Sequence, residues 1–202
     1  MPTPRVAVVG RGRLGTALAA QLGAAGVRVD GPHGRGFDGG DADVVLLCVP
    51  DGSIALAAAA LPTRDGRVVG HCSGATTLAP LAPHTAFSLH PLMTVTGPGS
   101  PLRGAPCAVA GSTPEALAVA EALGTAVGMR SLRVDDADRA AYHAAASVAA
   151  NYLLAVEDLA DRIAVGVGLD RAALAPLVRA AVDGWQEHGA PAALTGPVAR
   201  GD

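Results

Sequence analysis

The stretch that decides the fold lies near the start of the chain and reads Arg5-Val-Ala-Val-Val, followed by Gly10-Arg-Gly-Arg-Leu-Gly15. The short valine-rich run is typical of a buried strand. Glycines then occupy the first, third and sixth positions of a turn, and residues 16–22 continue with a helical pattern. The stretch therefore predicts a strand, a glycine-rich turn and a helix in direct succession.

This succession is typical of a dinucleotide-binding site. Gly10 permits the tight turn, Gly12 lets the backbone approach a pyrophosphate, and Gly15 lets the helix pack close to the strand. The first amides of the helix, at Arg13 and Leu14, would then face the anion. A glycine-rich turn alone is weak evidence in a chain with 26 glycines, but the strand before it and the helix after it supply the required context.

The identity of the dinucleotide is left open by the next segment. Asp30 lies twenty residues beyond Gly10, after a second valine-containing strand at 27–30, and could accept hydrogen bonds from a ribose, which favours NAD. Arg35 and His33 could instead contact a 2′-phosphate, which favours NADP, or could simply be solvated loop residues. The cofactor is therefore expected to be NADP or NAD, with a leaning towards NADP.

The following segments alternate between strand and helix patterns. Residues 43–50 form a continuous apolar run that ends at Val49 and Pro50, where a doubly wound sheet places its ligand crevice. Ser73 follows another short strand and is expected at the same crevice. Further strands are expected at 67–74, 86–91, 106–111 and 131–135, and helices at 53–61 and 113–123 (the latter capped by Ser112 or Thr113). The alternation predicts an α/β domain with a Rossmann-like doubly wound parallel sheet over 1–135.

The composition then changes to an alanine-rich helical pattern, which predicts an all-helical second domain over 136–202. One long helix is expected over 136–165, a second over 169–188, and a loop over 190–202. Asp135 or Asp136 is expected to cap the start of the first helix, and Gly166 and Gly168 are expected to end it. Asp170 is the expected N-cap of the second helix, which should kink or restart at Pro176.

A polar stripe crosses the long apolar helix at His143, Ser147 and Asn151, which are spaced four residues apart and so share one face of an α-helix. Such a stripe is costly inside a protein unless each group finds a partner. It could be a solvent-facing edge or a set of contacts between helices. Alternatively it faces the crevice, where His143 could supply a proton and Ser147 and Asn151 could orient a carbonyl or imine substrate.

His71 and His90 each lie towards the carboxyl end of a predicted strand, so both are expected to line the crevice or to close a strand end by hydrogen bonding. With only Cys72 nearby, they do not make the three- or four-ligand cluster that a metal needs, and no metal is expected. Near the end of the chain, Thr195 and Arg200 lie in a turn-rich stretch. This stretch is either a connection to a further helix or a substrate loop in which Arg200 clamps a carboxylate.

The composition excludes several other classes of function. The net charge of −3 without a basic block argues against nucleic acid as a partner. All fifteen basic residues are arginines, so no mechanism can use a lysine as base or Schiff-base nucleophile. The cysteines at positions 48, 72 and 107 are scattered and are expected to be reduced. The first strand leaves no room for a signal peptide and no apolar stretch is long enough to span a membrane, so a cytoplasmic protein without a membrane partner is expected.

The chain also resembles a known family, through motifs that run along its whole length. They are GRGRLG at 10–15, HCSGA at 71–75, SLHPL at 88–92, YHAAASVAANY at 142–152 and LTGPVARGD at 194–202. Together they resemble the bacterial Rossmann-like proteins whose C-terminal helical domain is of unknown function. More distantly, the chain is similar to the superfamily of pyrroline-5-carboxylate reductase, ketopantoate reductase, the deazaflavin-dependent NADP oxidoreductases, and the 6-phosphogluconate and hydroxyisobutyrate dehydrogenases.

This resemblance implies an N-terminal NAD(P) domain, a homodimer built through the C-terminal helices, and a site between the domains. The hydroxyacid dehydrogenases of the superfamily place a lysine four residues before an asparagine. Here Asn151 fits the asparagine, but Ser147 replaces the lysine, which leaves His143 as the best remaining proton donor. The family continues into further helices, so the helical domain is expected to be incomplete at Asp202.

The sequence thus predicts an NAD(P)-dependent oxidoreductase that transfers hydride between nicotinamide and a small carbonyl or imine compound. His90, Thr195 and Arg200 are the expected substrate contacts. The alternative is a protein that binds NAD(P) without turnover, as a sensor, a degenerate enzyme or an incomplete fragment.

Overall fold

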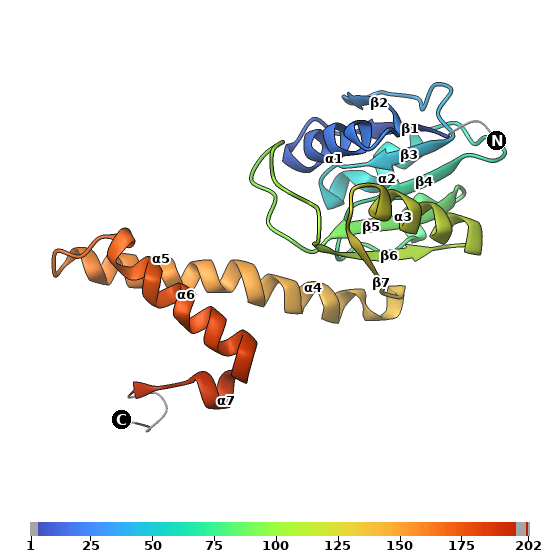
Figure 1. Cartoon of the computed structure of the whole chain (residues 1–202). Coiled ribbons are helices and arrows are strands. Elements are labelled where there is room, and N and C mark those ends of the chain that lie inside the picture. Colours follow the sequence, from blue (N-terminus) through green and yellow to red (C-terminus); the bar gives the residue numbers. More distant parts are fainter. Residues whose placement is uncertain (1–3, 197–200, 202) are drawn as a thin grey trace. The chain divides into compact units, whose positions relative to one another are not determined.

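The computed structural model describes residues 4–196 and 201, which form two compact units (Figure 1). The first unit runs to Ser147 and the second begins at Val148.

The first unit is built on a seven-stranded sheet with the order β2-β1-β3-β4-β5-β6-β7. The chain reverses direction across the sheet after β2, so β1 and β3 meet at a topological switch point. The strands are β1 (Arg5–Val9), β2 (Arg28–His33), β3 (Val44–Leu47), β4 (Val68–His71), β5 (Thr85–Pro91), β6 (Pro106–Gly111) and β7 (Arg130–Arg133). The predicted Rossmann-like α/β architecture is confirmed.

One strand pair departs from the parallel arrangement. Neighbouring strands from β1 to β5 are parallel, but β5 and β6 are antiparallel, and β6 and β7 are parallel again. The physical reason lies in the connection, because residues 92–105 contain no helix to carry the chain back across the sheet. A parallel neighbour requires such a crossover, whereas an antiparallel one does not.

Helices cover both faces of the sheet: α1 (Arg13–Ala24) and α3 (Pro114–Ala126) on one side, and α2 (Ile54–Ala59) on the other (Figure 1). Alternate residues of β1 enter different cores, since Val6 packs with α1 and α3 while Val9 packs with α2. The predicted cap of α3 is confirmed, because the Thr113 side chain accepts a hydrogen bond from the Ala116 amide.

The predicted single helix over 136–165 is wrong in one respect. It is divided into α4 (Arg139–Ser147), a π-helical stretch (Val148–Tyr152) and α5 (Leu153–Val165). A π turn closes i→i+5 hydrogen bonds, so it accommodates one residue more than an α turn. The cap predicted at Asp135 or Asp136 is also wrong. Asp135 makes no side-chain cap bond, and the Asp136 carboxylate accepts hydrogen bonds from the Leu78 amide and from Arg139.

The remaining helices are α6 (Arg171–His188) and α7 (Ala190–Ala193), and the latter stands where a loop was predicted. Two of the predicted helix-end signals are confirmed. Gly166 caps the end of α5, and the Asp170 carboxylate accepts a hydrogen bond from the Ala173 amide at the start of α6. α6 continues through Pro176 without restarting. Among the described residues, no helix is both long enough and apolar enough to cross a membrane.

Candidate functional site

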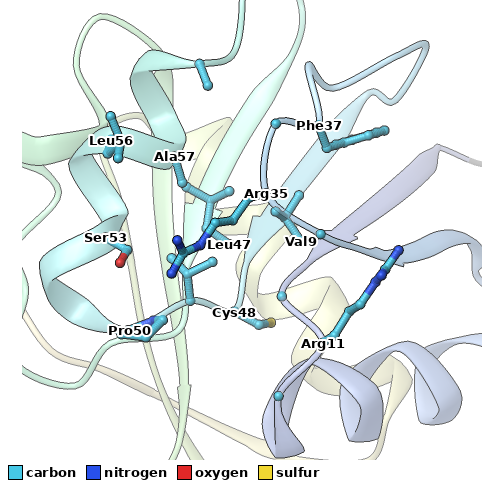
Figure 2. Close-up of a pocket in the computed structure, with 16 residues that line it drawn as sticks. Val9, Arg11, Arg35, Phe37, Leu47, Cys48, Pro50, Ser53, Leu56 and Ala57 are labelled. Atoms are coloured by element: carbon cyan, nitrogen blue, oxygen red, sulfur yellow. The ribbon is translucent and has the colours of Figure 1, made fainter.

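A cavity of about 500 Å³ lies at the switch point, at the carboxyl ends of β1 and β3 (Figure 2). It is lined by residues 9–12 after β1, 34–37 after β2 and 47–50 after β3, together with Ser53, Leu56, Ala57 and Ala60 beside α2. The predicted cofactor residues Gly10, Gly12, Arg35, Val49 and Pro50 are among them. This is the place where open α/β sheets bind their ligands.

The geometry of the turn requires two of its glycines. Gly10 has a φ of +121°, and a Cβ on it would lie 2.1 Å from the carbonyl oxygen of Cys48. A Cβ on Gly15 would lie 2.0 Å from the carbonyl oxygen of Gly10. Gly12 is different, because a Cβ there would meet no atom within 4 Å. Gly10 and Gly15 therefore hold the turn close to β3, whereas Gly12 faces open space.

The N-terminus of α1 opens beside Gly12, which is its N-cap and carries no side chain to satisfy the first amides. The first turn holds no acidic residue. The amides of Arg13 and Leu14 have no acceptor inside the helix and contribute the positive end of its dipole. The predicted cofactor residues Arg13, Leu14 and Gly15 do not line the cavity.

Two arginines line the cavity, and none of the described lining residues is acidic. Arg11 reaches towards β2, with its Nε atom 3.4 Å from the Pro32 carbonyl oxygen and its guanidinium carbon 3.6 Å from a Cβ built on Gly34. The Arg35 guanidinium points into the cavity (Figure 2). Sequence reasoning missed Arg11, although its position inside the glycine turn was a usable signal.

Asp30, the predicted ribose contact, does not line the cavity. β2 extends to His33, so Asp30 lies inside the strand and not at its carboxyl end. Its carboxylate accepts a hydrogen bond from Arg5 Nη2 at 2.8 Å. It also lies 3.0 Å from His33 Nε2, but this contact does not have the geometry of a hydrogen bond. The His33 ring stacks on Phe37 with centroids 3.8 Å apart. Asp30 is thus engaged within the protein, whereas the His33 ring is stacked but its Nε2 has no hydrogen-bond partner among the described residues.

Ser73 holds a tight turn after β4 instead of lining the cavity. Its hydroxyl lies 2.8 Å from Asp51 Oδ2 and 2.9 Å from Thr76 Oγ1, and it accepts a hydrogen bond from the Thr76 amide. His71 supports the same turn, since its Nδ1 accepts from the Ser73 amide and its Nε2 therefore donates to the Thr77 carbonyl oxygen. Burial lowers the pKa of His71, which keeps this ring neutral.

A second polar cluster forms where β5 meets α4. His90 Nδ1 lies 2.7 Å from the Tyr142 hydroxyl, and the rings of His90 and His143 are 6.5 Å apart. Both imidazoles face the buried Gly74, because a Cβ there would lie 2.8 Å from His143 Nδ1 and 3.0 Å from His90 Nε2. His143 Nδ1 is buried and has no hydrogen-bond partner among the described residues. The structure thus brings together two predicted site residues and adds Tyr142.

Arg139 anchors this cluster and was missed by sequence reasoning. It is only 1% exposed, and it donates hydrogen bonds to the Ser73 carbonyl oxygen, the Ser88 hydroxyl and the Asp136 carboxylate. These bonds tie the start of α4 to the turn after β4 and to the middle of β5. The usable signal was its position four residues before His143, on the same face of an alanine-rich helix.

The environment of His90 makes the stability of the protein depend on pH. Its pKa is lowered from 6.5 to about 4, first by burial and then by the positive charges of His143 and Arg139. The unfolded chain therefore takes up this proton at a higher pH than the folded protein does. We expect the free energy of unfolding to have its full value above pH 6.5 and to fall by about 3 kcal/mol as the pH falls towards 4.

Urea unfolding at about pH 7.5 and about pH 4.5 measures this difference. In the variant His90→Gln the pH dependence should become shallower, although His71 contributes a dependence of the same sign. An equal pH dependence in the variant and the natural protein would show that His90 is not the group responsible.

The remaining predicted site residues come at or after the end of α4 in the chain. Ser147 is partly exposed at the end of α4. Asn151, in the π-helical stretch, and Thr195, after α7, are exposed and belong to the second unit. Residues four apart share a face only in an α-helix, so the predicted spacing does not carry over past Ser147. Arg200 lies outside the described residues. Across 4–196 and 201, no group of three or more His, Cys, Asp or Glu side chains could hold a metal ion.

Comparison with known proteins supports the architecture. A family model described as a domain of unknown function (DUF2520) matches residues 105–202. No curated protein matches the chain.

Solved structures share the fold over nearly the whole chain. A Bacteroides fragilis protein assigned as an NADP oxidoreductase aligns with a TM-score of 0.84 at 19% identity, covering 98% of this chain and 86% of its own. A Thermotoga maritima protein aligns at 0.76 and 23% identity, covering 98% and 85%. Pyrroline carboxylate reductase from Plasmodium falciparum, solved with NADP bound, aligns at 0.68 and 13% identity, covering 93% and 79%. At these identities the likeness shows the fold, which is that of Rossmann-like proteins with a helical region after the sheet.

Proposed function

We propose that the cavity at the switch point binds NAD(P). The observation that carries this proposal is the combination of the open N-terminus of α1 with the empty space over Gly12. A pyrophosphate over Gly12 would accept hydrogen bonds from the amides of Arg13 and Leu14. Val49 and Pro50 would line the path of the cofactor towards Ser73. Two proteins of the same fold carry NADP in their names or crystals, which supports a nicotinamide cofactor.

Of the two cofactors, NADP fits the charges better. Arg11 and Arg35 both line the cavity on the side of β2, where the adenosine ribose of a dinucleotide lies in this fold. A 2′-phosphate between them would form charge-assisted hydrogen bonds. An NAD ribose would instead use a carboxylate at the cavity, and Asp30 does not line it.

We further propose that the protein is an oxidoreductase acting on a small carbonyl or imine compound. The cofactor supplies or accepts the hydride. His143 donates or accepts the accompanying proton, because its buried Nδ1 has no partner among the described residues and lies beside the Gly74 backbone. Tyr142 orients His90 through Nδ1, which leaves His90 Nε2 turned towards the same space. Ser147, Asn151, Thr195 and Arg200 remain proposed substrate contacts.

Replacing His143 with glutamine tests the reaction. We expect turnover to fall by about 100-fold or more, since a general acid contributes about 10² to 10⁴. Cofactor affinity should stay nearly unchanged, because His143 does not line the cavity. The measurement is the loss of nicotinamide absorbance with a panel of keto acids and cyclic imines. His188→Gln, at the exposed end of α6, is the matched control and should retain full turnover.

Binding of NAD(P) without turnover is the second candidate function. The specific observation in its favour is the absence of lysine from a chain whose superfamily includes lysine-dependent dehydrogenases. If the natural protein binds the cofactor but turns over no member of the panel, this candidate replaces the first. An unchanged turnover in His143→Gln would instead remove His143 from the mechanism.

We also propose that the second unit forms a homodimer. Its described residues include one buried side chain, Ala164, while many large apolar side chains are exposed. They are Val148, Tyr152, Leu153, Leu154, Val156, Leu159, Ile163, Val165, Val167, Leu169, Leu177, Val182, Trp185 and Leu194. Helices that are apolar on several faces need a partner. Sedimentation equilibrium should give the mass of two chains, and a monomer at all concentrations would contradict the proposal.

A further inference from the structure

Two cysteines that the sequence separates widely lie side by side, directly after the ends of β3 and β4. Cys48 follows β3 directly and Cys72 follows β4 directly, and these strands are paired with Leu47 opposite His71. The Cys72 amide donates to the Leu47 carbonyl oxygen at 3.2 Å, which continues the register to the two cysteines. Their sulfur atoms are 3.6 Å apart. Both thiols are free.

The two thiols differ in environment. Cys48 is partly exposed and lines the cavity, so small solutes can reach it. Cys72 is 7% exposed and packs in the core. The hydrogen bond with Cys48 and burial raise the pKa of Cys72 well above its ordinary value, so Cys72 is the less reactive of the two thiols towards a solute in the cavity. Cys48 is therefore placed as the attacking group and Cys72 as the resolving one.

Cys48 also supports the glycine turn. Its carbonyl oxygen would be 2.1 Å from a Cβ on Gly10, and its own Cβ would be 3.2 Å from a Cβ on Gly15. The turn therefore rests directly on the backbone and side chain of this residue. Any displacement of Cys48 must be transmitted to the residues that we propose hold the pyrophosphate.

We propose that Cys48 and Cys72 form a reversible disulfide when hydrogen peroxide enters the cavity, and that this disulfide weakens NAD(P) binding. The second half of the proposal rests on the proposed cofactor site, whereas the first half does not. Neighbouring strands lie about 4.8 Å apart, within the Cα separations of about 4.4 to 6.8 Å that disulfides span. The sulfur atoms must approach from 3.6 Å to about 2.05 Å.

The reaction balances in two steps. The Cys48 thiolate attacks one peroxide oxygen, so that an S–O bond forms, the O–O bond breaks, and hydroxide leaves and takes up the former Cys48 proton as water. As the Cys72 sulfur attacks the Cys48 sulfur, the Cys72 thiol hands its proton to the sulfenic oxygen, so that the S–S bond forms, the S–O bond breaks, and a second water leaves. The two thiols are oxidised by two electrons, and one peroxide is reduced to two waters.

The chemical half is tested on the natural protein by mass spectrometry after exposure to about one equivalent of hydrogen peroxide and alkylation of the remaining thiols. We expect a peptide joining Cys48 to Cys72 that dithiothreitol separates. The cross-link should persist in Cys107→Ser, since Cys107 is buried in β6, and should be absent from Cys48→Ser and Cys72→Ser. Sulfinic acid at Cys48 without a cross-link, or a cross-link to Cys107, would overturn the proposal. Because the peptide is identified in the natural protein, a variant that fails to fold does not obscure the result.

The functional half is tested by titrating the reduced and the peroxide-treated protein with NADPH. We expect about tenfold weaker binding after oxidation, recovery with dithiothreitol, and no effect of peroxide on Cys48→Ser, which lacks the thiol that peroxide reaches first. Because linkage is reciprocal, saturating NADPH should also shift the equilibrium between disulfide and dithiol towards the dithiol by the same factor in a dithiothreitol redox titration. Equal affinity of the two forms would overturn the regulatory half. If the reduced protein fails to bind nucleotide at all, the cofactor site and this half both fall, while the cross-link result stands by itself.

Discussion

Replacing Gly15 with alanine is expected to abolish NAD(P) binding and to lower the free energy of unfolding by about 2 to 3 kcal/mol. The added Cβ would lie 2.0 Å from the Gly10 carbonyl oxygen, and the obstacle is backbone that no side-chain rotation can move. α1 must therefore shift away from the turn, which displaces the amides that face the proposed pyrophosphate. Urea unfolding and a nicotinamide fluorescence titration measure the two effects.

Two other glycines supply matched controls for this change. A Cβ on Gly12 meets no atom within 4 Å, so Gly12→Ala should fold normally but bind NAD(P) about tenfold more weakly, because the methyl group occupies the space proposed for the pyrophosphate. Gly23, later in α1, is equally unobstructed, and Gly23→Ala should change neither property adversely. If Gly15→Ala were as stable as Gly23→Ala, the close packing described for this turn would be incorrect.

Replacing Arg139 with alanine is expected to have the largest effect on stability, a loss of about 3 to 5 kcal/mol. The guanidinium is buried and donates to three acceptors, and the Ser73 carbonyl oxygen and the Ser88 hydroxyl lie in surroundings that water does not reach. Removing the donor leaves them unsatisfied. The start of α4 also loses its tie to the sheet, so Tyr142 and His143 should lose their positions and turnover should fall with stability.

The contrast is provided by Arg133, which lies on the exposed edge strand β7 and pairs with Glu121 of α3. Arg133→Ala should cost less than about 1 kcal/mol, because exposed ion pairs contribute little. Urea unfolding of both variants under the same conditions gives the comparison. Similar small losses for both would mean that the buried hydrogen bonds of Arg139 do not hold α4 in place.

Much of the first unit was predictable from local sequence. The valine-rich run before Gly10 and the continuous apolar run at 44–47 could only be buried strands, because a glycine turn or a proline bounds each of them. The caps at Thr113 and Asp170 were readable because a single side chain reaches an amide three residues on.

What could not be predicted depends on contacts between distant segments. The length of β2, which places Asp30 inside a strand and beside Arg5, is set by pairing with β1. The antiparallel direction of β6 follows from the connection between β5 and β6, which contains no helix. No motif in the sequence indicates this. The approach of Cys48 to Cys72 requires the register of β3 and β4, which no spacing within the sequence reveals.

The candidate site was predictable to a similar extent. Gly10, Gly12, Arg35, Val49 and Pro50 lie around one cavity because they end neighbouring strands or follow them, which is a property of topology. The polar stripe was predicted on the assumption of one regular α-helix. The π-helical stretch after Ser147 breaks that assumption, so His143 is found beside His90 and Tyr142, while Asn151 belongs to the second unit.

The most direct test of the central claim is a titration of the purified natural protein with NADPH and with NADH, followed by nicotinamide fluorescence. The cavity, the open N-terminus of α1 and the two lining arginines predict binding in the micromolar range, with NADPH bound more tightly than NADH. Failure of both nucleotides to bind would contradict the assignment of the cavity as a dinucleotide site, and the proposed oxidoreductase activity would fall with it.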